Sequence, residues 1–216
     1  MSFEWAAWAS LVSASFAQSD ATAPRASRGY RMEILLDRFD GGSWKPVDPG
    51  LVLDRADRVH FRFRSNFDGY LYVFNRGTSG KAEQLFPRAE TGRQNMIQSG
   101  QEYQVPATDT LFRIDGPAGY EVVYWLVSPV RLAEGLSHLA PAPTRAPGLE
   151  PRCDDAILWA RGDCVDSAAG VKLTPGDLPY RNPQDLLLMR QKDASVVASP
   201  VPLNQPVIYE FHLAHR

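Results

Sequence analysis

The chain has 216 residues, of which 44% are hydrophobic and 22% charged, and its formal net charge is −2. These proportions are close to the globular average, so they exclude disorder or a coiled coil for the bulk of the chain. The near-neutral charge also excludes the basic footprint of a nucleic-acid-binding protein, and we expect no nucleic acid as a partner. The 17 prolines and 16 glycines favour a turn-rich β protein over a helical one.

The N-terminus has the features of a secretory signal peptide. An apolar run at residues 5–17 has the length of a signal-peptide core and is too short to span a bilayer. It ends with small residues at the two positions that signal peptidase reads, which predicts a signal peptide at residues 1–17 and a flexible segment at 18–29. Residues 1–4 contain no basic residue, so a buried N-terminal helix is the alternative.

The two cysteines, Cys153 and Cys164, are expected to form one disulfide, because an even cysteine count in an exported chain is typical of disulfide bonding. Free buried thiols and a metal site are the alternatives. The close histidine pair, His212 and His215, argues against a metal because residues three apart on a strand point to opposite faces. We therefore expect a periplasmic or extracellular protein with no transmembrane span, metal or cofactor.

Period-two alternation predicts short strands from residue 30 onwards. Met32, Ile34 and Leu36 alternate with polar residues, and Gly41-Gly42 then favours a hairpin turn towards Trp44. In the next strand, apolar residues alternate with His60, Arg62 and Arg64, which predicts a basic outer face. Further strands are expected at residues 70–74, 82–86, 101–105, 111–114 and 121–127, with the 70–74 strand in a central position.

The chain changes character after Pro129. Four prolines between residues 141 and 151 predict an extended linker. Asn182-Pro183 before Leu186–Arg190 predicts the start of a short helix. Alternation at residues 207–213 predicts a last strand that returns to the sheet.

The fold class expected from this organisation is all-β, as an immunoglobulin-like antiparallel β-sandwich. We expect a single sandwich domain at residues 30–216. A loop-rich, disulfide-pinned insertion at about 130–205 is expected to precede its last strand.

The sequence contains no motif of a familiar hydrolase, metalloprotease or nucleotide-binding site. No catalytic residue is therefore assigned. The four histidines, at positions 60, 138, 212 and 215, are each expected at the surface. Cys164 beside a histidine could form a nucleophilic pair, but the predicted disulfide would remove it.

Five tyrosines in the predicted strands are candidate ligand contacts, since exposed tyrosine rings can stack on sugars or anchor a peptide. They are Tyr70, Tyr72, Tyr103, Tyr120 and Tyr124. Packing in the core is the alternative interpretation of the same residues.

An ordered set of short motifs carries a resemblance to a family. The run Phe67-Asp68-Gly69-Tyr70-Leu71-Tyr72-Val73-Phe74-Asn75 is followed by Leu85-Phe86-Pro87 and Gly116-Pro117-Ala118-Gly119. This stretch, Arg58 to Pro129, resembles the bacterial domain-of-unknown-function family 4384, and Tyr209–Leu213 resembles its closing strand. The resemblance implies an extracytoplasmic or surface-associated accessory β domain without catalytic residues. The long segment that holds the two cysteines departs from the family pattern.

The sequence thus favours a non-enzymatic exported module that binds another protein of the cell envelope or surface, or assembles there. A carbohydrate-binding β-sandwich, with a glycan as the partner, is one alternative. An unrecognised hydrolase with its site in residues 130–205 is the other.

Overall fold

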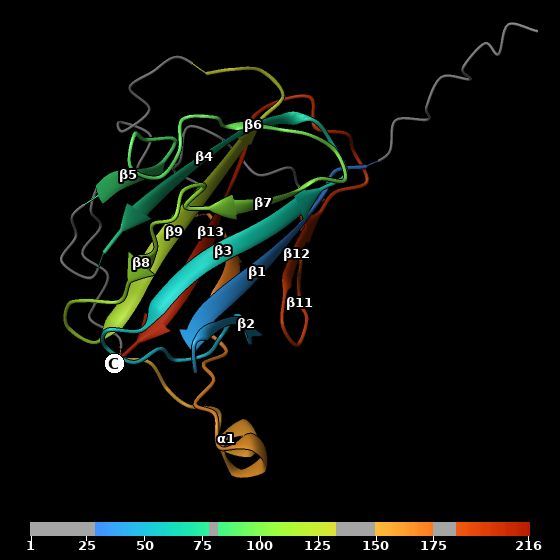
Figure 1. The fold of residues 1–216 in the computed structure, drawn as a ribbon. Coiled ribbons are helices and arrows are strands. Elements are labelled where there is room, and N and C mark those ends of the chain that lie inside the picture. The colour runs from blue at the N-terminus through green and yellow to red at the C-terminus, as the bar shows by residue number, and fades with distance from the viewer. Residues whose placement is uncertain (1–28, 78–81, 133–149, 175–184) are drawn as a thin grey trace, which may run out of the picture.

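The structure is a computed structural model that describes residues 29–77, 82–132, 150–174 and 185–216. Within these residues, two antiparallel sheets pack face to face as a β-sandwich (Figure 1). The predicted all-β class and sandwich architecture are confirmed. The predicted signal peptide, all but the last residue of the predicted flexible segment, and His138 lie outside the described residues.

The first sheet has the strand order β11-β12-β1-β3-β7, with β2 paired to β1 and β8 paired to β3. Its turn between β1 and β2 uses positive φ angles at Gly41 (57°) and Gly42 (84°), as a tight hairpin requires. The strands are β1 (Arg31–Asp40), β2 (Ser43–Val47), β3 (Arg58–Ser65), β7 (Glu102–Val105), β8 (Phe112–Arg113), β11 (Leu187–Arg190) and β12 (Ser195–Ala198).

The second sheet has the order β10-β13-β9-β4-β5, with β6 paired to β4. The predicted central position of the strand at residues 70–74 is confirmed, because β4 lies between β9 and β5. The strands are β4 (Gly69–Arg76), β5 (Ala82–Phe86), β6 (Met96–Ile97), β9 (Gly119–Ser128), β10 (Gly170–Leu173) and β13 (Val207–His215).

Aromatic side chains join the two sheets across the core. Trp125 of β9 meets Phe61 and Phe63 of β3 edge-to-face, with ring centroids 5.4 and 5.6 Å apart. Phe61 also meets Phe211 of β13 at 5.2 Å. All four side chains are buried, and this geometry adds to the free energy gained by removing their apolar area from water.

The predicted helix at Leu186–Arg190 is wrong, since residues 187–190 form β11 and pair with β12. In β11 the side chain of Leu188 packs against the core whereas its neighbours Leu187 and Met189 are exposed. This period of two is that of a strand, and pairing with β12 overrides the local start signal of a helix. The start signal itself, Asn182-Pro183, lies outside the described residues.

Three strands within residues 130–205 belong to the sheets: β10 joins the second sheet, and β11 and β12 extend the first. The chain then returns through β13, which lies between β9 and β10. The predicted last strand is confirmed. Within the described residues, the structure contains no helix long and apolar enough to cross a membrane.

The position of β13 generates a stability prediction. Phe211→Ala should lower the free energy of unfolding by about 3–5 kcal/mol, because the truncation leaves a cavity beside Phe61 in a closed core. Leu173→Ala, on the adjacent strand but 52% exposed, is the matched control and should change it by less than about 0.5 kcal/mol. Urea denaturation followed by circular dichroism measures both. Equal losses in the two variants would show that β13 does not close the core.

Candidate functional site

The predicted disulfide is confirmed and closes a loop on one end of the sandwich. Cys153 and Cys164 are bonded, and the loop between them contains the short helix α1 (Asp155–Arg161). Asp154 caps α1 by accepting a hydrogen bond from the Ile157 amide at 3.1 Å, and Gly162 ends it with a φ of 76°. We call residues 153–164 the stapled loop.

Backbone pairing holds the base of the stapled loop against the sandwich. The Asp154 amide donates to the Val165 carbonyl at 2.7 Å, and the Val52 amide donates to the Cys164 carbonyl at 2.8 Å. Val165 also forms an antiparallel bridge with Leu51. Both ends of the loop are therefore fixed by hydrogen bonds in addition to the disulfide.

Asp166, two residues after the stapled loop, is buried and holds neighbouring segments together. Its carboxylate accepts hydrogen bonds from the Tyr120 hydroxyl and the Arg152 amide, both at 2.6 Å, and from the Ala168 amide at 2.7 Å. Burial alone would raise the pKa of Asp166, but these hydrogen bonds outweigh burial and lower it. Burial and the Asp166 carboxylate together raise the pKa of Tyr120. Asp166 thus stays ionised and links β9 to both flanks of the disulfide.

The outer part of the stapled loop presents apolar side chains to solvent. No residue of α1 is buried, Trp159 is 88% exposed and Leu158 is 38% exposed. The helix projects away from both sheets (Figure 1). An exposed tryptophan on a firmly held loop is typical of a contact surface rather than of a core element.

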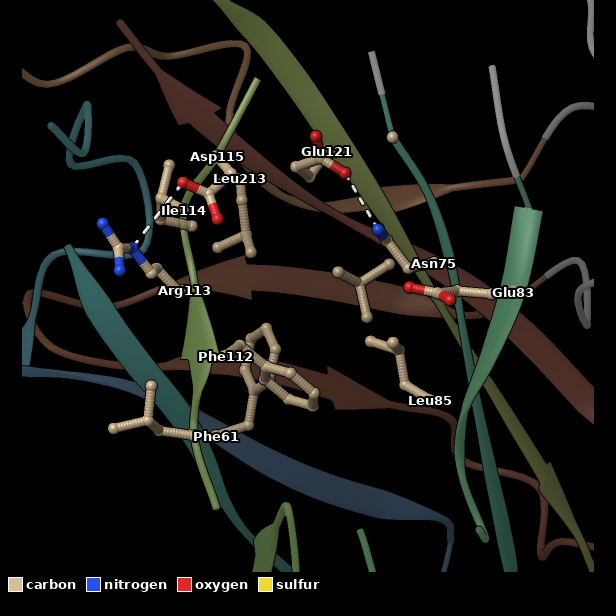
Figure 2. A pocket seen from close by; sticks show the side chains of 13 residues that line it. Phe61, Asn75, Glu83, Leu85, Phe112, Arg113, Ile114, Asp115, Glu121 and Leu213 are labelled. Carbon is tan, nitrogen blue, oxygen red and sulfur yellow. Dashed lines mark hydrogen bonds and ion pairs between the residues drawn. The ribbon is translucent and has the colours of Figure 1, made fainter. Parts of the chain in front are cut away.

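A second feature is a cavity of about 370 Å³, the inter-sheet pocket, which is open to solvent at the edge where β8 faces β5 and β9. Figure 2 shows apolar side chains around the pocket, from Leu213 and Ile114 beside Asp115 to Leu85 below Glu83. The apolar lining consists of Phe61, Leu85, Leu111, Phe112, Ile114, Val123 and Leu213. Most of these residues belong to the main core cluster, so the floor of the pocket is the exposed end of the core.

Polar residues form the mouth of the inter-sheet pocket. Glu83, Asp115 and Glu121 supply carboxylates, and Arg113 lies 3.6 Å from Asp115. Asn75 donates a hydrogen bond to Glu121 at 2.9 Å. None of the described lining residues is Ser, Thr, Cys or His.

The prediction that each histidine lies at the surface is wrong for His60 and His215, which are both buried. His60 shares a hydrogen bond of 2.8 Å with Asp37, which is also buried. The Trp44 ring of β2 lies tilted over the His60 ring, with the ring centroids 3.9 Å apart. Arg62 binds the same carboxylate through its Nε and, at 3.0 Å, through Nη2. The alternation of β3 correctly placed His60 on the outer face, but the β1–β2 hairpin covers that face.

His215 ends β13 with its Nε2 3.6 Å from Glu121, whereas His212 lies on the opposite face of the strand and is partly exposed. His212 pairs with Glu210 at 2.6 Å. The described residues contain no group of three or more His, Cys, Asp or Glu side chains placed to hold a metal ion. These histidines therefore take part in pairwise contacts with carboxylates.

The five candidate tyrosines do not lie on one common surface. Tyr70, Tyr72 and Tyr124 share the cluster on the outer face of the second sheet, where Tyr72 and Tyr124 are buried. Tyr103 stacks on Phe63 at 5.5 Å and packs against the core. Tyr120 binds Asp166. These positions favour packing and anchoring over a flat platform for a sugar.

Sequence reasoning missed Trp159 and the pocket residues as candidates. A signal for Trp159 was present, because Asp154 and Gly162 frame a helical turn inside the segment that the two cysteines enclose. The pocket had no local signal, since it forms where residues from β3, β4, β5, β8, β9 and β13 meet.

The comparisons with known proteins identify a family for part of the chain. Residues 52–131 match the family model described as Domain of unknown function (DUF4384), so the predicted resemblance is confirmed for this stretch. No curated protein and no solved structure matches the chain. The match spans β3 to β9, which include most of the pocket lining, and ends before the stapled loop.

The Asp37 cluster generates a prediction with a pH signature. Asp37→Asn should lower the free energy of unfolding at pH 7 by about 3–5 kcal/mol, because the buried His60 and the partly exposed Arg62 lose the carboxylate that both of them bind. Burial alone would raise the pKa of Asp37, but hydrogen bonds from His60 and Arg62, with their charges, lower it. The contribution of Asp37 to the free energy of unfolding is therefore complete above the pKa of an unfolded aspartate, about 3.9. It disappears as the pH falls through the lower pKa that Asp37 has in the folded protein.

Urea denaturation at a series of pH values measures the difference in free energy of unfolding between the wild type and Asp37→Asn. This difference should become smaller only below about pH 4. Asp40→Asn is the control, since Asp40 forms an exposed pair with Lys45 and should contribute about 0.5 kcal/mol or less. A wild-type protein no more stable than Asp37→Asn at pH 7 would contradict the prediction.

Proposed function

We propose that this protein is a non-enzymatic exported binding module that contacts another protein of the cell envelope or surface through the stapled loop. The observation that carries this proposal is the 88% exposure of Trp159 on a loop that a disulfide and Asp166 hold in place. Tryptophan is enriched among the residues that dominate binding energy in protein interfaces. An indole side chain that stays in water does not stabilise the sandwich itself.

The rigidity of the loop supports a role in recognition. A flexible loop loses conformational entropy when a partner orders it, and this loss subtracts from the binding free energy. The disulfide, the α1 caps and the hydrogen bonds at Val165 and Asp166 impose that order before binding. Loops positioned by a rigid β scaffold commonly carry binding.

The charges of the loop indicate the chemistry of the partner. Asp154 and Asp163 flank the helix and Asp155 is its first residue, against a single basic residue within the loop, Arg161. A complementary partner presents an apolar cleft for Trp159 with basic residues around it, since opposite charges steer association and fix the orientation.

The disulfide also supports export. Disulfides persist in oxidising compartments and are rare where thiols are kept reduced. A bonded Cys153–Cys164 pair is therefore consistent with a periplasmic or extracellular location. Release of a signal peptide at residues 1–17 is part of this proposal.

Photo-crosslinking tests the proposed contact. The native exported protein with Trp159→p-benzoylphenylalanine should crosslink one reproducible envelope protein, because residue 159 lies at the centre of the proposed interface. The same substitution at Met96, which is 50% exposed and remote in the sequence, is the control and should not yield that adduct. Mass spectrometry identifies the product.

The affinity of variants for the identified partner then measures how much Trp159 contributes to the binding free energy. Trp159→Ala should weaken binding by about 2 kcal/mol or more, roughly 30-fold, as expected for a central aromatic contact. Met96→Ala should leave it unchanged. Equal affinity of Trp159→Ala and wild type, with both folded, would refute the stapled loop as the binding surface.

A further inference from the structure

The β1–β2 hairpin carries another exposed tryptophan, at the end of the first sheet where β1 ends (Figure 1). Trp44 is 37% exposed, although its ring lies over His60 with the ring centroids 3.9 Å apart. Phe39, opposite Trp44 in the hairpin, meets the indole edge-to-face at 5.2 Å. These two contacts fix the indole, and its exposed part lies away from His60.

An arginine with unused hydrogen-bond donors lies beside these rings. Val59 and Phe61 of β3 belong to the core, so Arg58 lies on the opposite, outer face of the strand. Its guanidinium carbon is 4.0 Å from the centroid of the Phe39 ring. Within the described residues Arg58 forms no ion pair and no side-chain hydrogen bond. A ring face attracts the guanidinium charge without accepting its N–H groups in the plane, so these donors stay available.

A second arginine adds positive charge at the same point. Arg58 and Arg113 are directly opposite each other in the pairing of β3 with β8. Like charges in this arrangement repel each other and destabilise the strand pair. Arg113 lies 3.6 Å from Asp115, so one carboxylate serves two guanidinium groups. An anion bound here would remove the remaining repulsion.

The carboxylates around this point are each paired with another cation. The pairs are Asp37 with Arg62, Asp40 with Lys45, Asp57 with Arg38, and Asp115 with Arg113. Arg58 is the cation that has no carboxylate among the described residues. The hairpin end of this face therefore attracts an anion, next to an exposed aromatic ring.

We propose that Phe39, Trp44, Arg58 and Arg113, which we call the Trp44 site, bind an anionic saccharide. The apolar C–H face of a sugar ring lies on the exposed part of the indole. The carboxylate or sulfate of the sugar accepts N–H groups from Arg58, whose planar fork matches either anion. The site lies on an open sheet face, which suits a chain of sugar units that extends beyond the contact.

The net charge of the protein favours a saccharide over a nucleic acid, the other polymer that combines rings with anions. A phosphate backbone requires an extended basic surface, whereas this chain has a net charge of −2 and a single unpaired arginine at the Trp44 site. One isolated cation beside one ring matches a polymer in which each ring carries at most one anionic group.

Titration of the folded protein, followed by ¹⁵N–¹H chemical shifts, tests this proposal. Oligosaccharides of galacturonate and of glucuronate supply carboxylates, and a sulfated galactan oligosaccharide supplies sulfates. At least one of the three should give saturable shifts at residues 39–45, 58–60 and 112–113. The uncharged form of the responding sugar, methyl-esterified or desulfated, should bind at least about fivefold more weakly. Oligoglutamate, which has the charge without a sugar ring, should also bind at least about fivefold more weakly.

Matched substitutions test the two parts of the Trp44 site. Arg58→Gln and Trp44→Ala should each weaken binding by about fivefold or more. Arg93→Gln is the control for charge and should have little effect, because Arg93 is also exposed and has no ion pair among the described residues but precedes β6 of the other sheet. Arg58 is exposed, so its variant tests the site even if Trp44→Ala perturbs the hairpin.

Three results would overturn the proposal: no saturable shift with any anionic oligosaccharide, equal binding of the uncharged sugar or of oligoglutamate, or an equal effect of Arg93→Gln. Trp159→Ala should leave the titration unchanged, since the proposal does not depend on the stapled loop. An equal loss of binding in Trp159→Ala would assign the saccharide to that loop instead of the Trp44 site.

Discussion

The contact of Trp125 with Phe61 and Phe63 fixes the distance between the two sheets. The positions of the inter-sheet pocket and of the stapled loop depend on this contact. The aromatic rings fill the centre of the sandwich, where Phe211 completes the cluster. Towards the edge, β8 has only two residues, so the first sheet covers less of the second and the inter-sheet pocket opens there. The pocket is thus the place where the aromatic packing ends, and its apolar floor follows from that.

The second sheet also determines where the stapled loop is held. Tyr120 at the start of β9 binds Asp166, and the adjacent Val165 pairs with Leu51. A few residues later β10 joins the edge of β13. The segment that carries the disulfide is therefore fixed at both of its ends, and only its outer part, with Trp159, faces solvent. Rigid attachment and an exposed apolar tip occur together because the anchoring groups lie at the base of the loop and just beyond it.

Local sequence patterns predicted most strands because each has one face in the core. β1, β3 and β13 show the period of two that a buried face imposes, and their apolar residues do point inwards. The same patterns failed for residues 187–190, where a proline and a polar cap indicated a helix but a partner strand was available. They also left His60 at the surface, because nothing in β3 indicates that Trp44 of another strand covers it. Such errors arise where tertiary contacts decide between two locally acceptable states.

The two surface features differ in how they relate to the family. The match at residues 52–131 contains every described lining residue of the inter-sheet pocket except Leu213. The stapled loop lies outside the matched region, in the segment that departs from the family pattern. The described lining of the pocket therefore lies almost entirely within the matched region. The proposed recognition through Trp159 depends instead on a loop outside the matched region.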